Sequence, residues 1–493
     1  MTALNADTVG RTFANSLEIM KPWFDEGVMS QFASDDTLLS LIERQKENVV
    51  GGHIIGAINT GRSHGHGGSH TTLLPDPDRQ KYQNARATLT KFYGSGQIDG
   101  EVMQKAREDP GAFIEPIAAE LSGIVRDQRD DWSDMLAGDG SGRVGTVISV
   151  ASAASGILTV KHPFDLPAST SAKEGGVAPR VQVGGVYAIV DISASATGAQ
   201  AFHQYDVGGL TVKRFYCSAV NEDTGACTFL LPTALDGSTA TAAEFTTTGL
   251  VAAVAAGDVL VKCKDRTVTN AVDAADATFH TKQTTYRKLG SQFVSNASDG
   301  CAELMGFYAP ASDADVFAEY QSGTAVGLGY QGLTVAANPY WKAYVDSNSG
   351  TPRALTVRMF TKAIDKIEIG GDGNVPFYIT SPAVREIIRS TFTEDDVRYV
   401  NTDDAKIGFR GLHVMGRPMI ITDSMPASGI LMFDPSIFSL EMLEAFGFLA
   451  RDGMIFRQVP QHDEWSFHTV MQAQTWCRMR RRFARIDDID VTP

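Results

Sequence analysis

The alternation of apolar and polar residues predicts a long two-stranded arm in the first part of the chain. Val49 to Ile58 has the composition of a strand, and within Tyr82 to Tyr93 alanine and leucine alternate with arginine and threonine. Between the two, His53 to Gln80 is rich in glycine, proline and polar residues, so it cannot bury enough apolar surface to offset its ordering entropy. A long loop without a core of its own indicates binding or disorder. We expect it to lie on a neighbouring surface.

The next periodic stretch predicts a long amphipathic helix. Asp109 before Pro110 is a good helix start, because the aspartate can cap the helix and proline lacks only an N–H that the first turn does not use. Apolar residues then recur at three- and four-residue spacing, and Ile114 to Leu136 corresponds to a rod of roughly 34 Å. Pro116 either kinks the first turns or marks the true start. The glycines between Gly138 and Gly142 end the helix.

The pattern of apolar and polar residues changes at two places in the remainder of the chain. From Val144 to about Thr269, short β-type runs alternate with turn residues, which predicts an inserted all-β barrel or sandwich. Beyond Ser291 the pattern is mixed α+β. Helices are predicted at Ala354 to Ile369 and Pro382 to Thr391, and strands at Phe377 to Thr380, Leu412 to Val414, Met419 to Thr422, Ile430 to Phe433, Trp465 to Trp476 and Arg478 to Ile486.

The N-terminal segment, Met1 to Glu47, has the pattern of an extended arm that carries short helical pieces. Asp35 and Asp36 precede a short apolar run, Leu38 to Ile42, and this order is typical of a capped helix start. Because the apolar face is short, we expect it to dock elsewhere.

Length and charge narrow the class of protein. At 493 residues the chain is long enough for two to four domains. Its formal net charge of -15 argues against a broad basic field that wraps nucleic acid. There is no apolar run long enough to span a bilayer, and the first residues do not have the pattern of a signal peptide.

One basic cluster near the C-terminus is an exception to the acidic balance. It consists of Arg478, Arg480, Arg481 and Arg482, and acidic residues follow it closely. Two interpretations remain open. The cluster is either a contact to nucleic acid or to another subunit, or a solvated or salt-bridged edge strand.

The candidate chemistry is sparse. His64, His66 and His70 form the only metal-like cluster, but the surrounding glycines argue against the rigid support that a metal site needs. The five cysteines have no C-x-x-C spacing, and Cys217 and Cys227 could face each other across a hairpin, although free thiols are expected in a reducing cytosol. Phosphate-loop, zinc-protease, nucleophile-elbow and dinucleotide motifs are missing from the sequence. We therefore predict no catalytic residue, metal or cofactor.

Several short motifs occur in an order that resembles a known family. They are Gly51-Gly52; Asn84-Ala85-Arg86 through Gly100-Glu101; Gly111-Ala112-Phe113 leading to Glu120 and Gly138-Asp139-Gly140; Glu303-Leu304-Met305-Gly306; Tyr330-Gln331-Gly332-Leu333 with Trp341; and Gly416-Arg417-Pro418 before Asp423, Pro426 and Phe433-Asp434-Pro435. With this order of parts the chain resembles the major capsid proteins of tailed bacteriophages, which have the Hong Kong ninety-seven type coat fold. The resemblance covers most of the chain outside the β insertion.

The resemblance implies an α+β coat fold with defined parts. These are an N-terminal arm (1–47), an extended loop hairpin (48–96), the spine helix of a peripheral domain (97–142), an inserted β domain (143–270), an axial domain with peripheral connections (271–439) and a C-terminal return to the peripheral domain (440–493). The inserted domain is expected to strengthen the capsomer or to mediate contacts.

The same resemblance implies a structural role and its partners. Copies of the chain would form pentamers and hexamers of an icosahedral head shell around double-stranded DNA, assembled in the host cytoplasm, with portal and scaffolding or decoration proteins as further partners and no membrane. Contacts between subunits are expected on the extended loop at Arg62, His64, His66, His70, Asp76, Asp78 and Arg79, on the spine helix at Glu120, Arg126, Arg129 and Trp132, and on the C-terminal basic edge at Arg478, Arg480, Arg481 and Arg482.

Covalent cross-linking of the shell is not expected at the loop tip. Some members of the family cross-link through a lysine on the extended loop, but His53 to Gln80 contains no lysine and Lys81 lies at the base. Two other functions remain as alternatives: another virion assembly protein, such as a tail or decoration component, and a metal-dependent hydrolase that uses His64 and His66 or the Asp372 loop.

Overall fold

The structure is a computed structural model, and it describes residues 37–45, 49–50, 52–67, 76, 78–99, 116–140, 143–152, 155–165, 181–191, 201–202, 205–207, 210–212, 215–221, 224–230, 254–262, 304–313, 330–391, 397–399, 412–450, 453–458 and 464–491. The chain divides into two compact units. One comprises Met1–Ser34, Gly94–Gln128 and Phe448–His468, and the other comprises Asp35–Tyr93, Arg129–Gly447 and Thr469–Pro493. The fold class is α+β, as predicted.

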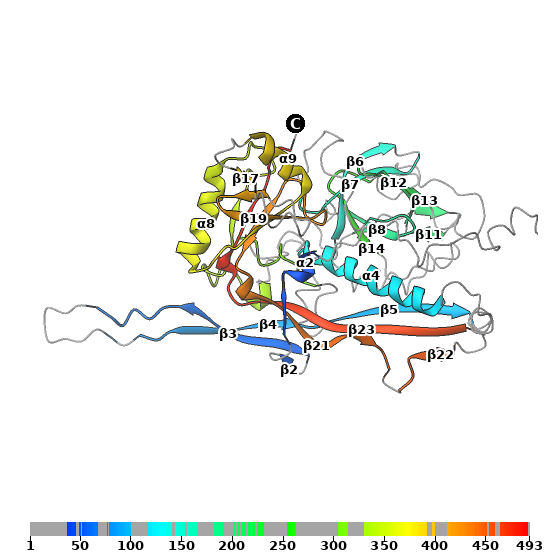
Figure 1. Ribbon diagram of the computed structural model, residues 1–493, viewed down its shortest axis with the longest axis horizontal. Coiled ribbons are helices and arrows are strands. Elements are labelled where there is room, and N and C mark those ends of the chain that lie inside the picture. Colours follow the sequence, from blue (N-terminus) through cyan, green and yellow to red (C-terminus); the bar gives the residue numbers. More distant parts are fainter. Residues whose placement is uncertain are drawn as a thin grey trace, which may run out of the picture. The chain divides into compact units, whose positions relative to one another are not determined.

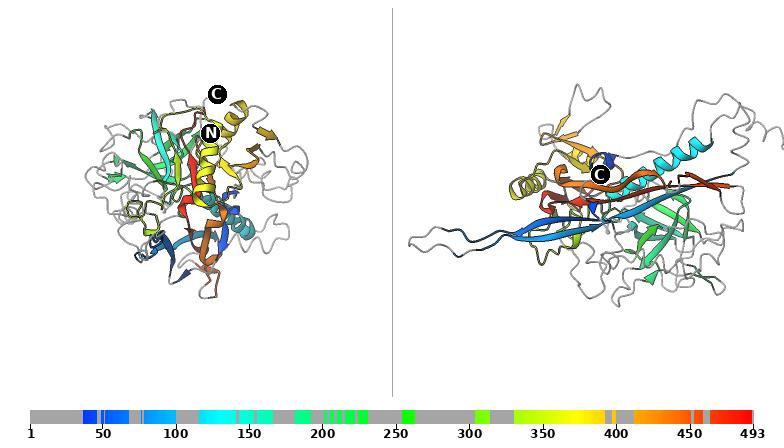
Figure 2. Two further views of the ribbon diagram at one scale, coloured as in Figure 1. Left: turned by 90° about the vertical axis from the view of Figure 1, so that its left-hand side faces the viewer. Right: turned by 90° about the horizontal axis from the view of Figure 1, so that it is seen from below.

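The predicted hairpin arm is present. Strands β2 (Val49–Val50), β3 (His53–Gly61) and β4 (Lys81–Thr88) form an antiparallel sheet in that order. Gly52 lies in the turn between β2 and β3 with a φ of +84°, which glycine adopts without a steric penalty. The register of β3 and β4 runs from His53 opposite Thr88 to Gly61 opposite Lys81. The right-hand view of Figure 2 shows these two strands running side by side.

The predicted spine helix is α4 (Pro116–Leu136). In the described part of the chain it begins at Pro116, one of the two starts that the sequence allowed, and the predicted start at Asp109 lies outside the described residues. At its C-terminal end, Leu136 is buried and its carbonyl accepts a hydrogen bond of 2.7 Å from the N–H of Phe307. This bond connects the helix end to the segment 304–313.

A second sheet collects strands from distant parts of the sequence. It contains β1 (Glu43–Gln45), β21 (Phe438–Phe448), β23 (Glu464–Cys477) and β22 (Phe456–Gln458) in that order, and β5 (Thr90–Asp99) also pairs with β23. Strand β1 is parallel to β21, with Glu43 opposite Ser439. The short helix α2 (Thr37–Ser40) buries Leu38 and Leu39 in the core of its own chain. The apolar face that was expected to dock elsewhere therefore docks internally.

The β insertion is a closed barrel. Within the described residues, a sheet has the order β12 (Phe215–Asn221), β13 (Ala226–Leu230), β7 (Ile157–Lys161), β6 (Arg143–Ser152), β14 (Val259–Lys262), β8 (Val186–Asp191) and β9 (Ala201–Phe202). Because β12 also pairs with β8, the sheet closes on itself. Closure removes the exposed edges that an open sheet would present. A separate hairpin joins β10 (Tyr205–Val207) and β11 (Leu210–Val212).

The last α+β region is built on one mixed sheet (Figure 1). Its order is β15 (Tyr344–Asp346), β24 (Phe483–Ile486), β20 (Ile430–Phe433), β16 (Tyr378–Thr380), β19 (Arg417–Ile421), β18 (Leu412–Val414) and β17 (Val397–Tyr399). Apolar residues of α8 (Val357–Gly371) and α9 (Pro382–Thr391) share one buried cluster with these strands. Short 3-10 turns are η4 (Tyr330–Gly332), η6 (Pro435–Ile437) and η7 (Arg480–Arg482).

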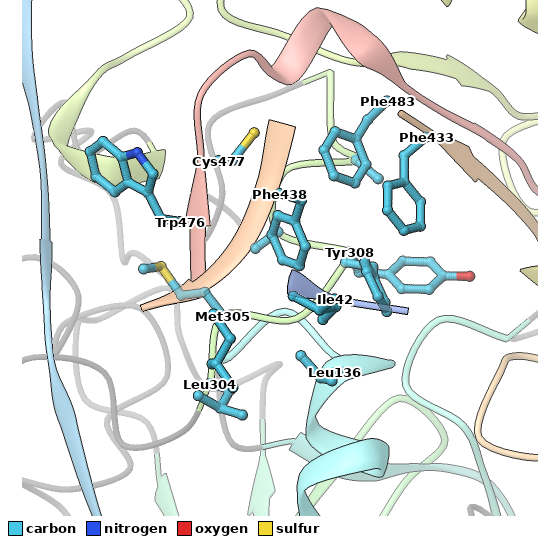
Figure 3. Packing of buried hydrophobic residues seen from close by; sticks show 14 of the residues in the cluster. Ile42, Leu136, Leu304, Met305, Tyr308, Phe433, Phe438, Trp476, Cys477 and Phe483 are labelled. Carbon is cyan, nitrogen blue, oxygen red and sulfur yellow. The ribbon is translucent and has the colours of Figure 1, made fainter. Parts of the chain in front are cut away.

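The C-terminal prediction needs correction. Arg478 to Ile486 was expected to be one closing strand, but η7 interrupts it and only β24 is extended. Strand β24 pairs with β20 and β15, so it belongs to the sheet of α8 and α9 and not to the sheet of β21 and β23. The predicted return to a peripheral domain at 440–493 stays a prediction, and its last strand, β24, lies in a different sheet from β23. The packing explains the change of sheet: Figure 3 shows Phe483 beside Phe433, and their rings stack with centroids 5.1 Å apart.

Candidate assembly interface

The base of the β3–β4 hairpin is held firmly by its own chain. Ile54 and Ala85 are fully buried, and Gly56 lies against the ring of Trp476. A Cβ atom added at Gly56 would lie 2.7 Å from Cζ2 of that tryptophan, closer than real contacts allow. The Nδ2 atom of Asn338 also donates a 2.9 Å hydrogen bond to Oε1 of Gln83. Packing and hydrogen bonds within the chain therefore hold the base of the hairpin in place.

One face of the hairpin is exposed along its length. Ile55 lies opposite Arg86, Ala57 opposite Asn84 and Asn59 opposite Tyr82, and all six residues are exposed. Since alternate residues of a strand point to the same side, these six side chains share one face, which we call the outer face. Ile55 keeps 53% of its surface exposed and Tyr82 keeps 65%. The outer face therefore presents apolar groups that nothing in the described chain covers.

The outer face was not predicted from the sequence, although the alternation of residues in β3 and β4 indicates it. Ala85 and Ala87 lie on the buried side of β4, and Tyr82 lies on its exposed side. Ile55 likewise alternates with the buried Ile54. Large apolar side chains on the solvent side of neighbouring strands make this face a candidate contact surface.

Within the described residues, the distal part of the hairpin makes its hydrogen bonds to itself. The Nδ2 atom of Asn59 donates to Oε1 of Gln80 over 3.1 Å. The carboxylate of Asp78 accepts from the backbone N–H groups of His64 at 2.8 Å and of Arg79 at 2.7 Å. These two backbone hydrogen bonds lower the pKa of Asp78. Asp78 thus fixes where the two sides of the tip approach each other.

The base of the hairpin also contains a pH-sensitive contact. A guanidinium nitrogen of Arg86 lies 2.6 Å from Nε2 of His53. Desolvation and the nearby positive charge of Arg86 both lower the pKa of His53. The geometry requires a neutral imidazole, because only the neutral ring can accept the hydrogen bond from arginine.

The predicted loop contacts are all at the surface where the structure describes them. Arg62, His64, His66, Asp76, Asp78 and Arg79 are exposed, and His70 lies outside the described residues. Positive and negative charges are mixed at the tip, and Asp78 is the one that organises the backbone. A contact between these side chains and a second subunit stays a prediction.

The predicted contacts of the spine helix divide into exposed and buried residues. Arg129 is exposed, and Arg126 lies 3.7 Å from the carboxylate of its neighbour Asp127. Trp132 is buried in edge-to-face contact with Phe92 and Phe446, with ring centroids 6.3 and 5.4 Å away. Trp132 is therefore a core residue, which corrects its prediction as a surface contact. The side chain of Glu120 lies outside the described part.

The C-terminal arginines divide in the same way. Arg480 is fully buried and donates to the carbonyl oxygens of Pro310, Trp341 and Ser312 at 3.2, 3.0 and 2.6 Å. Arg482 donates to the carbonyl of Gly371 and forms an ion pair of 3.1 Å with Asp434. The prediction of an exposed basic edge is wrong for Arg480, because its guanidinium serves internal carbonyl groups.

Two of the four arginines remain at the surface. Arg478 is exposed and donates a 3.2 Å hydrogen bond to Oε1 of Gln45. Arg481 is exposed, and its guanidinium lies 5.5 Å from the ring centroid of Tyr340, which itself keeps 69% of its surface exposed. Only these two residues of the predicted edge can reach a partner without rearrangement.

The described residues contain no group of three or more His, Cys, Asp and Glu side chains that could hold a metal ion. Among the described helices, none is long and apolar enough to cross a membrane. The candidate site consists of the outer face and the tip of the hairpin.

Comparison with known proteins gives matches in structure only. No family model matches the chain, and no curated protein matches it in sequence. A chain from the capsid asymmetric unit of cyanophage A-1(L) is 10% identical, with a TM-score of 0.48, and the match covers 97% of this chain and 99% of that chain. The capsid of a native GTA particle is 9% identical with a TM-score of 0.43, covering 99% and 100%.

A chain from Mycobacterium phage Adephagia is similar as well. It is 6% identical, with a TM-score of 0.38 and coverage of 98% of this chain and 99% of that chain. The first two of these three structures are capsids.

Proposed function

We propose that this chain is the major capsid protein of a tailed phage, and that its copies form the pentamers and hexamers of an icosahedral head shell around double-stranded DNA. The observation that supports the proposal best is the β3–β4 hairpin, which has a fixed base, an uncovered outer face and a tip that bonds only to itself among the described residues. The outer face and the tip make no described contact with the rest of the chain, whereas the base packs in the core. The exposed part of the hairpin is suited to lie on a second copy.

The energies involved suit a shell that closes by many modest contacts. Burial of the exposed part of Tyr82 is worth on the order of 2 kcal/mol, and Ile55 contributes on the order of 1 kcal/mol. Alone, such a contact is too weak for a stable pair. When each copy offers the same hairpin and receives another, the contacts are multiplied by closed symmetry. The chain therefore needs no enzymatic activity and no cofactor for this role.

The contact is noncovalent in this proposal. His53 to Gln80 contains no lysine, and Lys81 pairs with Gly61 at the end of the described ladder. Denaturing gels of mature particles should show a single band at the mass of one chain. Ladders of ligated chains would refute a noncovalent contact at the hairpin.

The remaining partners follow from the shell role. Arg478 and Arg481 are the exposed members of the C-terminal cluster and are the candidates for non-specific contact with packaged DNA or with another subunit. The closed barrel between β6 and β14 is a rigid module that can strengthen a capsomer. Portal and scaffolding or decoration proteins would join the shell during assembly in the host cytoplasm, and the mature protein would reside in the virion.

A matched pair of substitutions tests the hairpin contact. Ile55→Ser changes an exposed residue of the outer face, and Val183→Ser changes a residue of the barrel region that keeps 60% of its surface exposed. Both replace a β-branched apolar side chain in solvent, so both should leave the folded chain within about 0.5 kcal/mol of wild type. We expect Ile55→Ser, combined with Tyr82→Ser, to abolish particles in sedimentation, while Val183→Ser assembles. Normal assembly of the hairpin variant would contradict the proposed contact.

A further inference from the structure

Two buried cysteines lie on adjacent strands of the barrel, in diagonal positions. Strands β12 and β13 are adjacent and antiparallel, with Cys217 opposite Phe229 and Val220 opposite Cys227. The register shifts between Cys217 and Ala219, so the strand contains a bulge between the two ladder positions. Both thiols point into the barrel core, and neither residue has exposed surface.

The two thiols are in direct contact. A side-chain hydrogen bond joins Cys217 to Cys227. Each sulfur also lies 3.7 Å from a backbone carbonyl oxygen two residues away, Ala219 for Cys217 and Gly225 for Cys227. The backbone of the hairpin therefore holds both thiols in the barrel core on neighbouring strands.

The environment distinguishes the two sulfurs. The hydrogen bond from Cys227 lowers the pKa of Cys217, and the same bond, with burial, raises the pKa of Cys227. The lower pKa makes Cys217 the better nucleophile of the two. Cys477, buried in a different cluster, has its pKa raised to about 12 by burial. Cys477 is thus a buried thiol of the same chain whose pKa is raised, whereas the pKa of Cys217 is lowered.

We propose that Cys217 and Cys227 are an oxidisable dithiol, which a peroxide converts into a disulfide that closes the β12–β13 hairpin. The thiolate of Cys217 attacks one oxygen of hydrogen peroxide, the O–O bond breaks, and the released hydroxide takes up a proton to leave as water. The thiol of Cys227 then attacks the sulfenic sulfur of Cys217, and the hydroxyl group leaves with the thiol proton as a second water. Two thiols are oxidised by two electrons, and one peroxide is reduced to two waters.

The burial of both sulfurs determines the rate and the effect. Peroxide reaches the sulfurs only when the hairpin opens locally, so the reaction should be slower than that of an exposed thiol. Once formed, the disulfide closes the short loop from Cys217 to Cys227 and restricts the unfolded barrel. The melting transition of the barrel should rise by roughly 5 °C or more, and a reductant should reverse the shift. A chain in a reducing cytosol stays in the dithiol form, and the inference holds whatever the role of the chain.

The test uses the folded full-length chain. Samples treated with hydrogen peroxide or with a phosphine reductant are denatured in N-ethylmaleimide, digested and mapped by mass spectrometry. We expect a linked peptide pair containing Cys217 and Cys227, about 2 Da lighter than the two thiol peptides together, and alkylated Cys477. Cys217→Ser and Cys227→Ser should each remove the linked pair, and Cys477→Ser should retain it.

The result on the wild-type chain decides the inference without any variant that might fail to fold. Complete alkylation of Cys217 and Cys227 after prolonged oxidation of the folded chain would overturn it. Pairing of either residue with another cysteine would overturn it as well. A linked pair that forms without any rise in the melting transition would overturn the stabilising effect assigned to it.

Discussion

The burial of Arg480 leads to a prediction that separates it from its neighbour in sequence. Replacement of Arg480 by alanine removes three hydrogen bonds, of 3.2, 3.0 and 2.6 Å, to carbonyl oxygens of the segments 310–312 and 341. It also removes a guanidinium that lies 5.4 Å from the ring centroid of the buried Tyr330. Hydrogen bonds to charged groups contribute about 1.5–3 kcal/mol each, and they are not additive when they share one donor.

The expected loss for Arg480→Ala is therefore about 3–5 kcal/mol, the magnitude seen when one side of a buried charged network is deleted. That loss is a large share of a total stability of about 5–15 kcal/mol. Arg480→Lys keeps the positive charge but lacks the planar fork of donors that reaches three separate carbonyls, so its loss should be intermediate. In a melting experiment the alanine variant should unfold roughly 10 °C below wild type.

The control is the adjacent Arg481→Ala. Arg481 is exposed and its described contact is with the ring of Tyr340, so the same substitution should cost less than about 1 kcal/mol. Differential scanning calorimetry of the three variants at equal concentration gives the comparison. A melting temperature of Arg480→Ala within 2 °C or so of wild type, or an equal loss for Arg481→Ala, would refute the assignment of Arg480 as an internal anchor.

Three further predictions concern the hairpin and the helix. Gly56→Ala places a Cβ 2.7 Å from Trp476. This substitution should displace the hairpin base and make it susceptible to limited proteolysis. Gly67→Ala is the control, because no atom lies within 4 Å of its new Cβ, and it should leave the proteolysis pattern unchanged. Trp132→Ala should cost about 3–5 kcal/mol in urea unfolding, because it empties a buried ring site; a loss under about 1 kcal/mol would show that the ring is not packed. The pKa of His53 is lowered by desolvation and by Arg86, so its contribution to stability is complete above its ordinary value of 6.5 and is lost as pH falls through the lower folded value. His53→Gln should flatten this acid dependence in a melting series, and an unchanged pH profile would contradict the contact.

The local pattern of the sequence was enough to predict the hairpin and most of the last sheet. Alternation around Ala85 and Ala87 predicted a strand with a buried side, and β4 has it. The strands at Leu412–Val414 and Ile430–Phe433 and the helix at Pro382–Thr391 were predicted with the bounds that the structure shows. The residues within these elements determine their structure. The spacing of apolar residues and the residues that start and end each element are therefore enough to predict them.

The sequence could not show which surfaces meet. Arg480 and Arg481 are chemically identical neighbours, and only the carbonyl groups of segments far away in sequence make one internal and the other exposed. Trp132 followed the apolar period of the helix, but its burial depends on Phe92 and Phe446 from other elements. The pairing of β24 with β20 is likewise a long-range choice that the pattern of Phe483 to Ile486 does not encode.

In the proposed function, the hairpin joins copies of this chain into a shell. The most direct measurement is electron microscopy, with sedimentation, of the overexpressed full-length chain and of a variant that lacks Gly61 to Gly68. The wild-type chain should form pentameric and hexameric rings or closed shells, and the variant should stay as a folded small species with an unchanged melting transition. A wild-type chain that remains a stable monomer, or a deletion variant that assembles normally, would contradict the account.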